Sequence, residues 1–129
     1  MSDDATRLPV VLLLDDEAEL RHVMMRMLAD QFEVEGASSV EEARLLLAAR
    51  KFDALVCDHM MPGPVQGLDF LVEAMNVQPG AKRILMTGYM NPELLSRGVT
   101  LAQLSAVLLK PCSAQHLRTA LRDSLGWGV

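Results

Sequence analysis

The sequence predicts an α/β domain in which five strands alternate with five helices. Apolar runs at residues 10–14, 54–57 and 106–109 have the length and the nearby turn signals of buried parallel strands. Segments with apolar residues at helical spacing lie between the predicted strands. Alternation of this kind along a whole chain is typical of a parallel sheet that is covered by helices on both faces.

Length and composition favour one folded domain. The chain has 129 residues, of which 50% are hydrophobic and 22% charged, so we expect a single domain over residues 1–129 with a core at about 8–126. The net charge is −5 with no basic stripe, which argues against direct nucleic-acid binding. No apolar stretch approaches the ~20 residues of a membrane span. The acidic start lacks the features of a signal peptide, so we expect a cytoplasmic protein.

The first half of the chain contains three predicted strands and two predicted helices. Residues 10–14 form the first strand, residues 32–36 alternate apolar and polar side chains as a second, and residues 53–57 form the third. A capping box at residues 39–42 opens the helix between the second and third strands. The first helix is predicted to bury one face made of Leu20, Val23, Met24, Met27 and Leu28.

The second half continues the alternation. A loop with Pro62 leads to a helix, and strand four lies around residues 83–86. Asn91 is the predicted N-cap of a helix that Gly98 keeps short, and residues 98–105 carry no clear signal. Strand five is 106–109, and Ser113 is predicted to cap the last helix.

Five strand–helix units in series predict a doubly wound (βα)5 fold. The crossovers are expected to be right-handed, and the flavodoxin-like strand order 2-1-3-4-5 fits the pattern. In that order the alternating strand at residues 32–36 lies at an edge, where one of its faces can be wetter.

Charged residues follow three of the predicted strands. Asp15 and Asp16 follow the first, Asp58 the third and Lys110 the fifth, so they are expected to meet at the carboxyl edge of the sheet, where ligands bind. Two carboxylates ~4 Å apart repel by ~4 kcal/mol at an effective dielectric constant of ~20, which favours a bound hard cation. Acidic ligands without His or Cys favour Mg²⁺. Helix capping explains one of the acids, but not a third on another strand.

The remaining groups at this edge fit a phosphoryl site. Lys110 places an ammonium group there, and Thr87 adds a hydroxyl at the end of strand four. Carboxylates can act as nucleophiles and form aspartyl phosphates. A glycine-rich phosphate loop is absent from the sequence, which argues against a P-loop nucleotide site.

These motifs resemble the receiver domains of bacterial two-component response regulators, the CheY-like family. The resemblance covers nearly all of the chain, and its motifs occur in the family's order, each at a predicted strand end. The matching segments are Leu14-Asp15-Asp16-Glu17, Asp58-His59-Met60-Met61-Pro62 leading to Gly67, Met86-Thr87-Gly88, and Leu109-Lys110-Pro111.

The resemblance implies a role for each of these residues. Asp58 would accept a phosphoryl group from a sensor histidine kinase or a histidine phosphotransfer protein. Asp16 and Asp58 would hold Mg²⁺ directly with the backbone carbonyl of Met60, and Asp15 would act largely through water. Thr87 and Lys110 would contact the phosphoryl oxygens. The chain would be a phosphoacceptor rather than an enzyme proper, and it would control a downstream protein through the strand-five surface.

Three features depart from the common family pattern. One is that Met60 and Tyr89, both bulky and neither acidic, occupy the two places that in this family influence access of hydrolytic water. The loop between Pro62 and Gly67 is one residue longer than usual. The position three before the lysine, commonly Tyr or Phe, is Val107, so the usual inward-turning ring is missing. Thr87, Tyr89 and Val107 are therefore the switch candidates. Tyr89 either supplies a moving ring or lies on the surface beside the site.

Other functions account for fewer of these residues. A haloacid-dehalogenase-like phosphohydrolase also uses an aspartyl nucleophile, but its second acid is missing from Asp58-His59-Met60. A flavin carrier of flavodoxin type needs a phosphate-binding first loop, whereas this loop is acidic. Two variants of the leading hypothesis stay open: the receiver module of a longer regulator, and a receiver with a non-standard switch.

Overall fold

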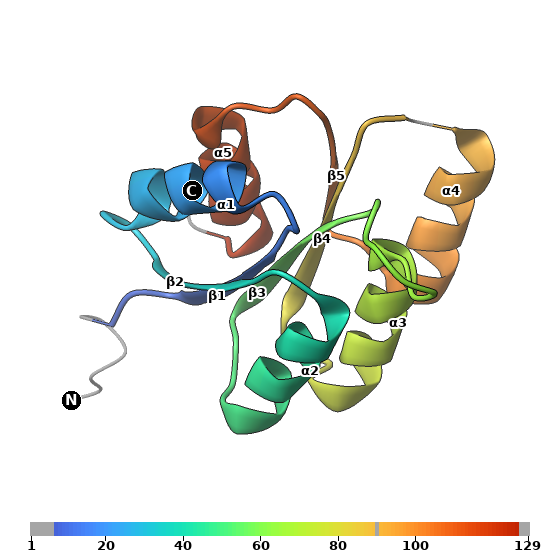
Figure 1. Cartoon of the computed structure of the whole chain (residues 1–129), viewed down its shortest axis with the longest axis horizontal. Coiled ribbons are helices and arrows are strands. Elements are labelled where there is room, and N and C mark those ends of the chain that lie inside the picture. The colour runs from blue at the N-terminus through green and yellow to red at the C-terminus, as the bar shows by residue number, and fades with distance from the viewer. Residues whose placement is uncertain (1–6, 90, 127–129) are drawn as a thin grey trace.

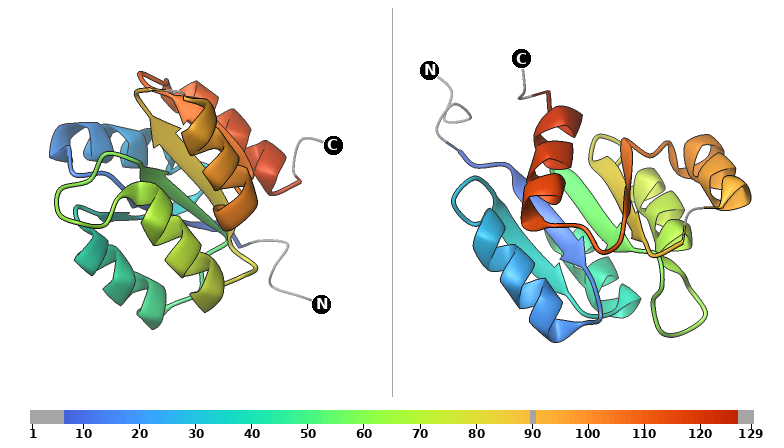
Figure 2. Two further views of the ribbon diagram at one scale, coloured as in Figure 1. Left: turned by 90° about the vertical axis from the view of Figure 1, so that its right-hand side faces the viewer. Right: turned by 90° about the horizontal axis from the view of Figure 1, so that it is seen from above.

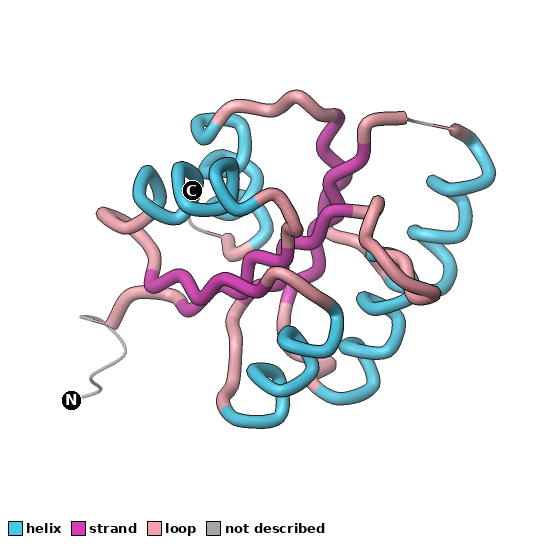
Figure 3. The backbone as a smooth tube through the Cα atoms, in the orientation of Figure 1, coloured by secondary structure: helices cyan, strands magenta, loops and turns pink. Residues whose placement is uncertain are grey.

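Five parallel strands form one sheet in the order β2-β1-β3-β4-β5, as the sequence predicts. The structure is a computed structural model, and it describes residues 7–89 and 91–126. Figure 3 shows the strands at the centre of the molecule, and in Figure 2 their arrows run in the same direction. The strands are β1 (Val10–Leu14), β2 (Glu33–Ala37), β3 (Ala54–Asp58), β4 (Lys82–Thr87) and β5 (Ala106–Leu109).

Helices cover both faces of the sheet. Helices α1 and α5 lie on one side of the sheet, while α2, α3 and α4 lie on the other (Figure 1). This is the doubly wound arrangement expected when each crossover is right-handed. A short π-helix, η2 (Gly98–Ala102), continues α4. The α-helices are α1 (Ala18–Leu28), α2 (Val40–Ala49), α3 (Gly67–Val77), α4 (Pro92–Arg97) and α5 (Ala114–Ser124).

The strands divide the core into two apolar clusters. Because successive side chains of a strand point to opposite faces, Val11 and Leu13 pack towards α1 and α5, whereas Leu12 and Leu14 pack towards α2 and α3. All five residues of β1 are buried, since a strand inside a doubly wound sheet is covered on both faces. Among residues 7–89 and 91–126, no helix is long and apolar enough to cross a membrane.

Three predicted helix caps are confirmed. The side-chain oxygens of Ser39, Asn91 and Ser113 each accept the backbone N–H of the residue three positions on, at 3.1, 2.7 and 3.1 Å. Each of these bonds satisfies a donor that the first helical turn leaves free. The predicted strand bounds are also close. β2 and β3 each begin and end one residue later than expected, and Asp58 is therefore the last residue of β3.

The predicted inward face of α1 is partly wrong. Met24 and Leu28 are buried, but Val23 and Met27 are 43% and 51% exposed. The helix meets the sheet through residues four positions apart, and Met25 packs on the other flank of this row. There Gly36 of β2 has no side chain, and an added Cβ would lie 2.6 Å from the sulfur of Met25. The buried stripe of α1 therefore contains Met25 in place of Val23 and Met27.

The prediction that the third apolar run is a buried strand is only partly confirmed. β5 pairs only with β4 and forms an edge of the sheet. Its first three residues are half-buried, and Leu109 is 52% exposed. An edge strand lacks a neighbour on one side, so its side chains lose part of the cover that β1 and β3 receive.

The segment that carried no clear sequence signal connects α4 to β5. The η2 turn ends at Gln103, which adopts a left-handed backbone conformation with φ 48°. Leu104 packs against Gly98, where an added Cβ would lie 2.6 Å from a Leu104 methyl. The buried guanidinium of Arg83 donates to the carbonyl of Ala102 at 2.7 Å and to that of Ala81 at 2.6 Å. A side chain from β4 thus holds the end of this connection.

Candidate functional site

Three carboxylates meet at the carboxyl edge of the sheet. Asp15 and Asp16 follow β1, and Asp58 ends β3, which pairs directly with β1. One carboxylate oxygen from each of the three lies within 4.8 Å of the others. Asp15 and Asp58 are 1% and 4% exposed, whereas Asp16 is exposed. The fold therefore brings together the three acids that the sequence singled out.

Lys110 adds a cation to this cluster. Its Nζ lies 2.9 Å from Asp58 Oδ2, 3.9 Å from Asp15 Oδ2 and 3.6 Å from Glu17 Oε1. The backbone N–H of Lys110 donates to Thr87 O at 2.8 Å, which fixes where the chain leaves β5. Burial lowers the pKa of Lys110, but the hydrogen bond to Asp58 and the surrounding carboxylates outweigh it and raise the pKa above its ordinary value. Lys110 is therefore a charged ammonium at neutral pH.

Backbone contacts fix the chain on both sides of Asp58. Its Oδ1 accepts the N–H of Met60 at 3.2 Å, and the N–H of His59 donates to Met86 O at 2.8 Å. Helix α3 begins against this loop, where the N–H of Gly67 donates to His59 O at 2.9 Å. A Cβ at Gly67 would collide with the carbonyl oxygen of Asp58. Glycine at this position is therefore required for the close approach of α3 to the end of β3.

Hydrogen bonds fix both the backbone and the carboxylate of Asp15. Its N–H donates to Ala37 O at 3.1 Å, and its Oδ1 accepts the N–H of Glu17 at 2.9 Å. Its backbone carbonyl accepts Nη1 of Arg21 at 2.7 Å. Burial raises the pKa of Asp15, against the lowering effect of the Glu17 N–H and the charge of Lys110. An ionised Asp15 is thus costly in the folded protein unless a further cation is present.

The donor set fits a hard divalent cation. The oxygens come from carboxylates, the ligand type that Mg²⁺ and Ca²⁺ prefer, and one of the three acids is open to solvent. The single ammonium of Lys110 cannot neutralise three carboxylates. The residues therefore fit the divalent cation that the sequence predicts. The predicted contribution of the Met60 carbonyl stays a prediction.

The three switch candidates differ in how deeply their side chains are buried. Thr87 ends β4 and is buried, and its Oγ1 accepts the N–H of Tyr89 at 3.2 Å and donates to Tyr89 O at 3.1 Å. The Tyr89 side chain is 72% exposed, which places it on the surface in this structure. Val107 lies in the middle of β5 and is half-buried. Thr87 is thus the only one of the three whose side chain is both polar and buried.

Two residues near the cluster had no role in the predictions from sequence. Glu17 Oε1 lies 3.6 Å from Lys110 Nζ, although in the sequence Glu17 is only the last residue of the Leu14-Asp15-Asp16-Glu17 motif. Arg21 holds the Asp15 carbonyl, and its signal in the sequence is weak: a basic residue in the first turns of an otherwise ordinary amphipathic helix. Only the path of α1 relative to β1 reveals that contact.

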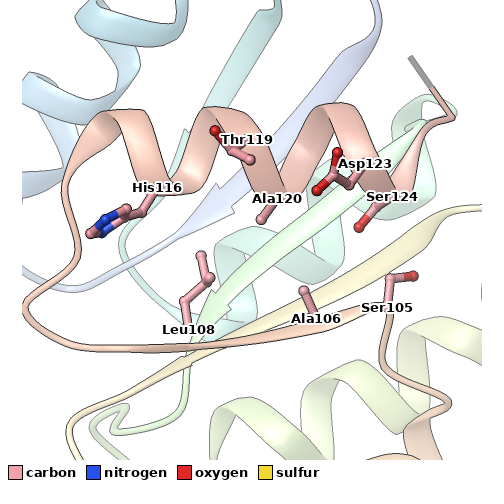
Figure 4. A pocket seen from close by; sticks show the side chains of 8 residues that line it. All are labelled: Ser105, Ala106, Leu108, His116, Thr119, Ala120, Asp123 and Ser124. Carbon is pink, nitrogen blue, oxygen red and sulfur yellow. The ribbon is translucent and has the colours of Figure 1, made fainter. Parts of the chain in front are cut away.

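A groove of about 460 Å³ lies between β5 and α5, and none of its lining residues belongs to the acidic cluster. Figure 4 shows its side chains, which come from the edge strand on one side and the helix on the other. The groove is lined by Ser105, Ala106, Leu108, His116, Thr119, Ala120, Asp123 and Ser124.

Comparison with known proteins identifies the family. Residues 11–122 match the family described as the response regulator receiver domain. Among curated proteins, the chain is 35% identical over 115 residues to the hydrogenase transcriptional regulatory protein HoxA of Cupriavidus necator, a match that covers 89% of this chain and 24% of that protein. The chain spans about a quarter of the length of the curated relatives that it matches.

Solved structures of receiver domains also resemble this chain. The signal receiver domain of an HD domain-containing protein from Pseudomonas fluorescens Pf-5 has a TM-score of 0.86 and 26% identity, covering 93% of this chain and 96% of that one. A CheY-like response regulator receiver domain protein from Methanospirillum hungatei JF-1 has a TM-score of 0.86 and 25% identity, covering 93% and 95%. The fold, the acidic cluster with its lysine and the match over residues 11–122 lead to one conclusion. The chain belongs to the response regulator receiver domain family.

Proposed function

We propose that this receiver domain is a phosphorylation-controlled switch in which Asp58 accepts a phosphoryl group from a sensor histidine kinase or a histidine phosphotransfer protein. The observation that carries this proposal is the buried Asp58 carboxylate, held 2.9 Å from Lys110 and beside two further carboxylates. A buried nucleophile with a fixed cation and a cluster of metal-ligating oxygens suits transfer of an anionic group.

The residues have distinct parts in this reaction. A carboxylate oxygen of Asp58 bonds to phosphorus as the P–N bond to the donor imidazole breaks, and the imidazole leaves with the bonding electron pair and takes up a proton. Mg²⁺ would be held directly by Asp16, Asp58 and the Met60 carbonyl, and largely through water by Asp15. When bound, it would neutralise charge on the phosphoryl oxygens. Lys110 and Thr87 would contact those same oxygens from the ends of β5 and β4.

The signal is proposed to leave through the surface around β5. Lys110 directly follows this strand, so a change in its contact with Asp58 acts on the strand's end. Because the strand is an edge with half-buried side chains, it can adjust with little repacking. The β5–α5 groove lies on the same strand and is the proposed contact region for a downstream protein. Val107 replaces the usual aromatic ring, so Thr87 and the backbone of Tyr89 are the proposed route.

The test is a phosphorylation assay read by intact mass. The full chain is incubated with Mg²⁺ and acetyl phosphate, and compared with Asp58→Asn and with Asp69→Asn, which removes an exposed acid on α3. We expect one phosphoryl group on wild type and on Asp69→Asn, and none on Asp58→Asn or without Mg²⁺. A wild-type protein that gains no phosphoryl group would overturn the proposal, as would an Asp58→Asn protein that gains one.

In a second possible organisation, this receiver is one module of a longer regulator. The relative HoxA favours it, because the match covers 24% of that transcriptional regulator. The intact mass of the native protein, isolated with an antibody against this chain, distinguishes the two. A mass of 14.2 kDa supports a separate receiver of residues 1–129, and a larger mass supports the module.

A further inference from the structure

A side chain of α1 holds the peptide group that carries two of the three acids. Arg21 Nη1 donates to the carbonyl oxygen of Asp15 at 2.7 Å, and this carbonyl belongs to the peptide bond between Asp15 and Asp16. The orientation of that peptide plane sets the directions in which both side chains leave the backbone. We propose that Arg21 is a positioning residue for the carboxylates of Asp15 and Asp16, and that divalent-cation binding depends on it.

Asp16 depends on this contact more than Asp15 does. The Asp15 carboxylate is also fixed by the Glu17 N–H, at 2.9 Å, and by burial. The Asp16 carboxylate is exposed and, among residues 7–89 and 91–126, it accepts no hydrogen bond. The side chain of Asp16 is therefore anchored only through its backbone, so the place from which its carboxylate reaches a cation depends on the plane that Arg21 holds.

The rest of Arg21 is packed for this contact. The side chain is half-buried, and its Cδ lies 3.2 Å from the position that a Cβ on Gly36 would occupy. The stem therefore runs beside β2 to the end of β1. The guanidinium bonds to a neutral carbonyl rather than to a carboxylate, so it leaves the acids free for a cation. Arginine suits this task because its planar fork directs its donors.

Charge and positioning predict opposite effects when Arg21 is replaced. A guanidinium close to a cation site repels a second cation, so loss of its charge alone would tighten Mg²⁺ binding. Loss of a contact that orients metal ligands typically weakens metal binding, by about tenfold or more. The sign of the change therefore separates the two explanations.

The test is Mg²⁺ binding to the full chain, measured by isothermal titration calorimetry. We expect Arg21→Met to weaken the affinity about tenfold and Arg21→Lys, which keeps the stem and the charge, to restore part of it. Arg26→Met removes the same charge from an exposed position of α1 and should leave the affinity unchanged. Thermal unfolding in EDTA checks that each variant is folded. If Arg21→Met does not fold, the Mg²⁺ affinity of Arg21→Lys is compared with that of wild type instead.

The inference rests on the proposed function for its metal, but the two can fail separately. A wild-type affinity retained or increased in Arg21→Met, or no Mg²⁺ binding to wild type, would overturn the positioning role. If Arg21→Met keeps or gains affinity but wild type is still phosphorylated in the Asp58 assay, only the positioning role is overturned and the proposed function is retained. Conversely, an Arg21-dependent affinity without phosphorylation of Asp58 would support positioning and reject the phosphoacceptor. At saturating Mg²⁺ we expect Arg21→Met to be phosphorylated at the wild-type rate, which a general structural defect would not give.

Discussion

At the residue scale, the Asp15 carboxylate combines deep burial with a position among other acids. Its side chain has almost no access to water, and burial is the largest cause of its raised pKa. The Asp58 and Glu17 carboxylates raise this pKa further, while the Glu17 N–H and Lys110 oppose the increase. A group of this kind favours cation binding at the expense of the stability of the metal-free protein.

We therefore expect Asp15→Asn to be more stable than wild type in EDTA at neutral pH, by about 1 kcal/mol. A raised pKa means that the folded state binds a proton more readily than the unfolded state, so wild type loses stability as the pH rises from the ordinary pKa through the raised one. The advantage of Asp15→Asn should disappear as the pH falls through that window. Urea unfolding at neutral and acid pH measures it, and a less stable Asp15→Asn at neutral pH would contradict this explanation.

At the scale of elements, the connection between α4 and β5 depends on one buried cation. Arg83 lies in β4 and donates to the carbonyls of Ala102 and Ala81. Burial lowers the pKa of its guanidinium, so the surrounding backbone must compensate for a poorly hydrated charge. The contact joins the end of η2 to the strand beside β5.

We expect Arg83→Met to lower the free energy of unfolding by about 3 kcal/mol, because it leaves two buried carbonyls without a donor. Lys82→Met, one residue earlier and exposed, should change it by less than about 0.5 kcal/mol. Urea unfolding followed by circular dichroism measures both values. Equal effects of the two variants would mean that Arg83 does not anchor the connection.

At the scale of the whole molecule, the site links cation binding to the stability of the fold. Strands β1, β3 and β5 each contribute charged residues to one edge, so a cation bound there joins segments far apart in the sequence. A ligand that binds only the folded state stabilises it by mass action.

We expect Mg²⁺ at about a hundred times its dissociation constant to stabilise wild type by about 2.7 kcal/mol. Asp58→Asn should lose most of this gain, and Asp69→Asn, on the exposed face of α3, should keep it. Thermal unfolding in EDTA and in Mg²⁺ measures the shift. An equal shift in all three proteins would indicate non-specific ion binding in place of a site at the sheet edge.

The alternation of elements, the strand order and the identity of the clustered residues could all be predicted from the sequence. These follow from local causes: apolar runs, caps at Ser39, Asn91 and Ser113, and the rule that parallel strands present their carboxyl ends at one edge. The same local signals placed Asp58 within one residue of its position at the end of β3.

Which side chains are covered, and which contacts hold the site, depends on how the elements pack together. Val23 and Met27 are exposed because α1 packs on the sheet through Met24 and Leu28, and Leu109 is exposed because β5 has one neighbour. The contact from Arg21 to the Asp15 carbonyl likewise depends on how α1 lies across β1 and β2. Periodicity describes one element at a time, whereas burial and such contacts arise between elements. The acids at the sheet edge could therefore be predicted from the sequence, but the arginine proposed to orient two of them could not.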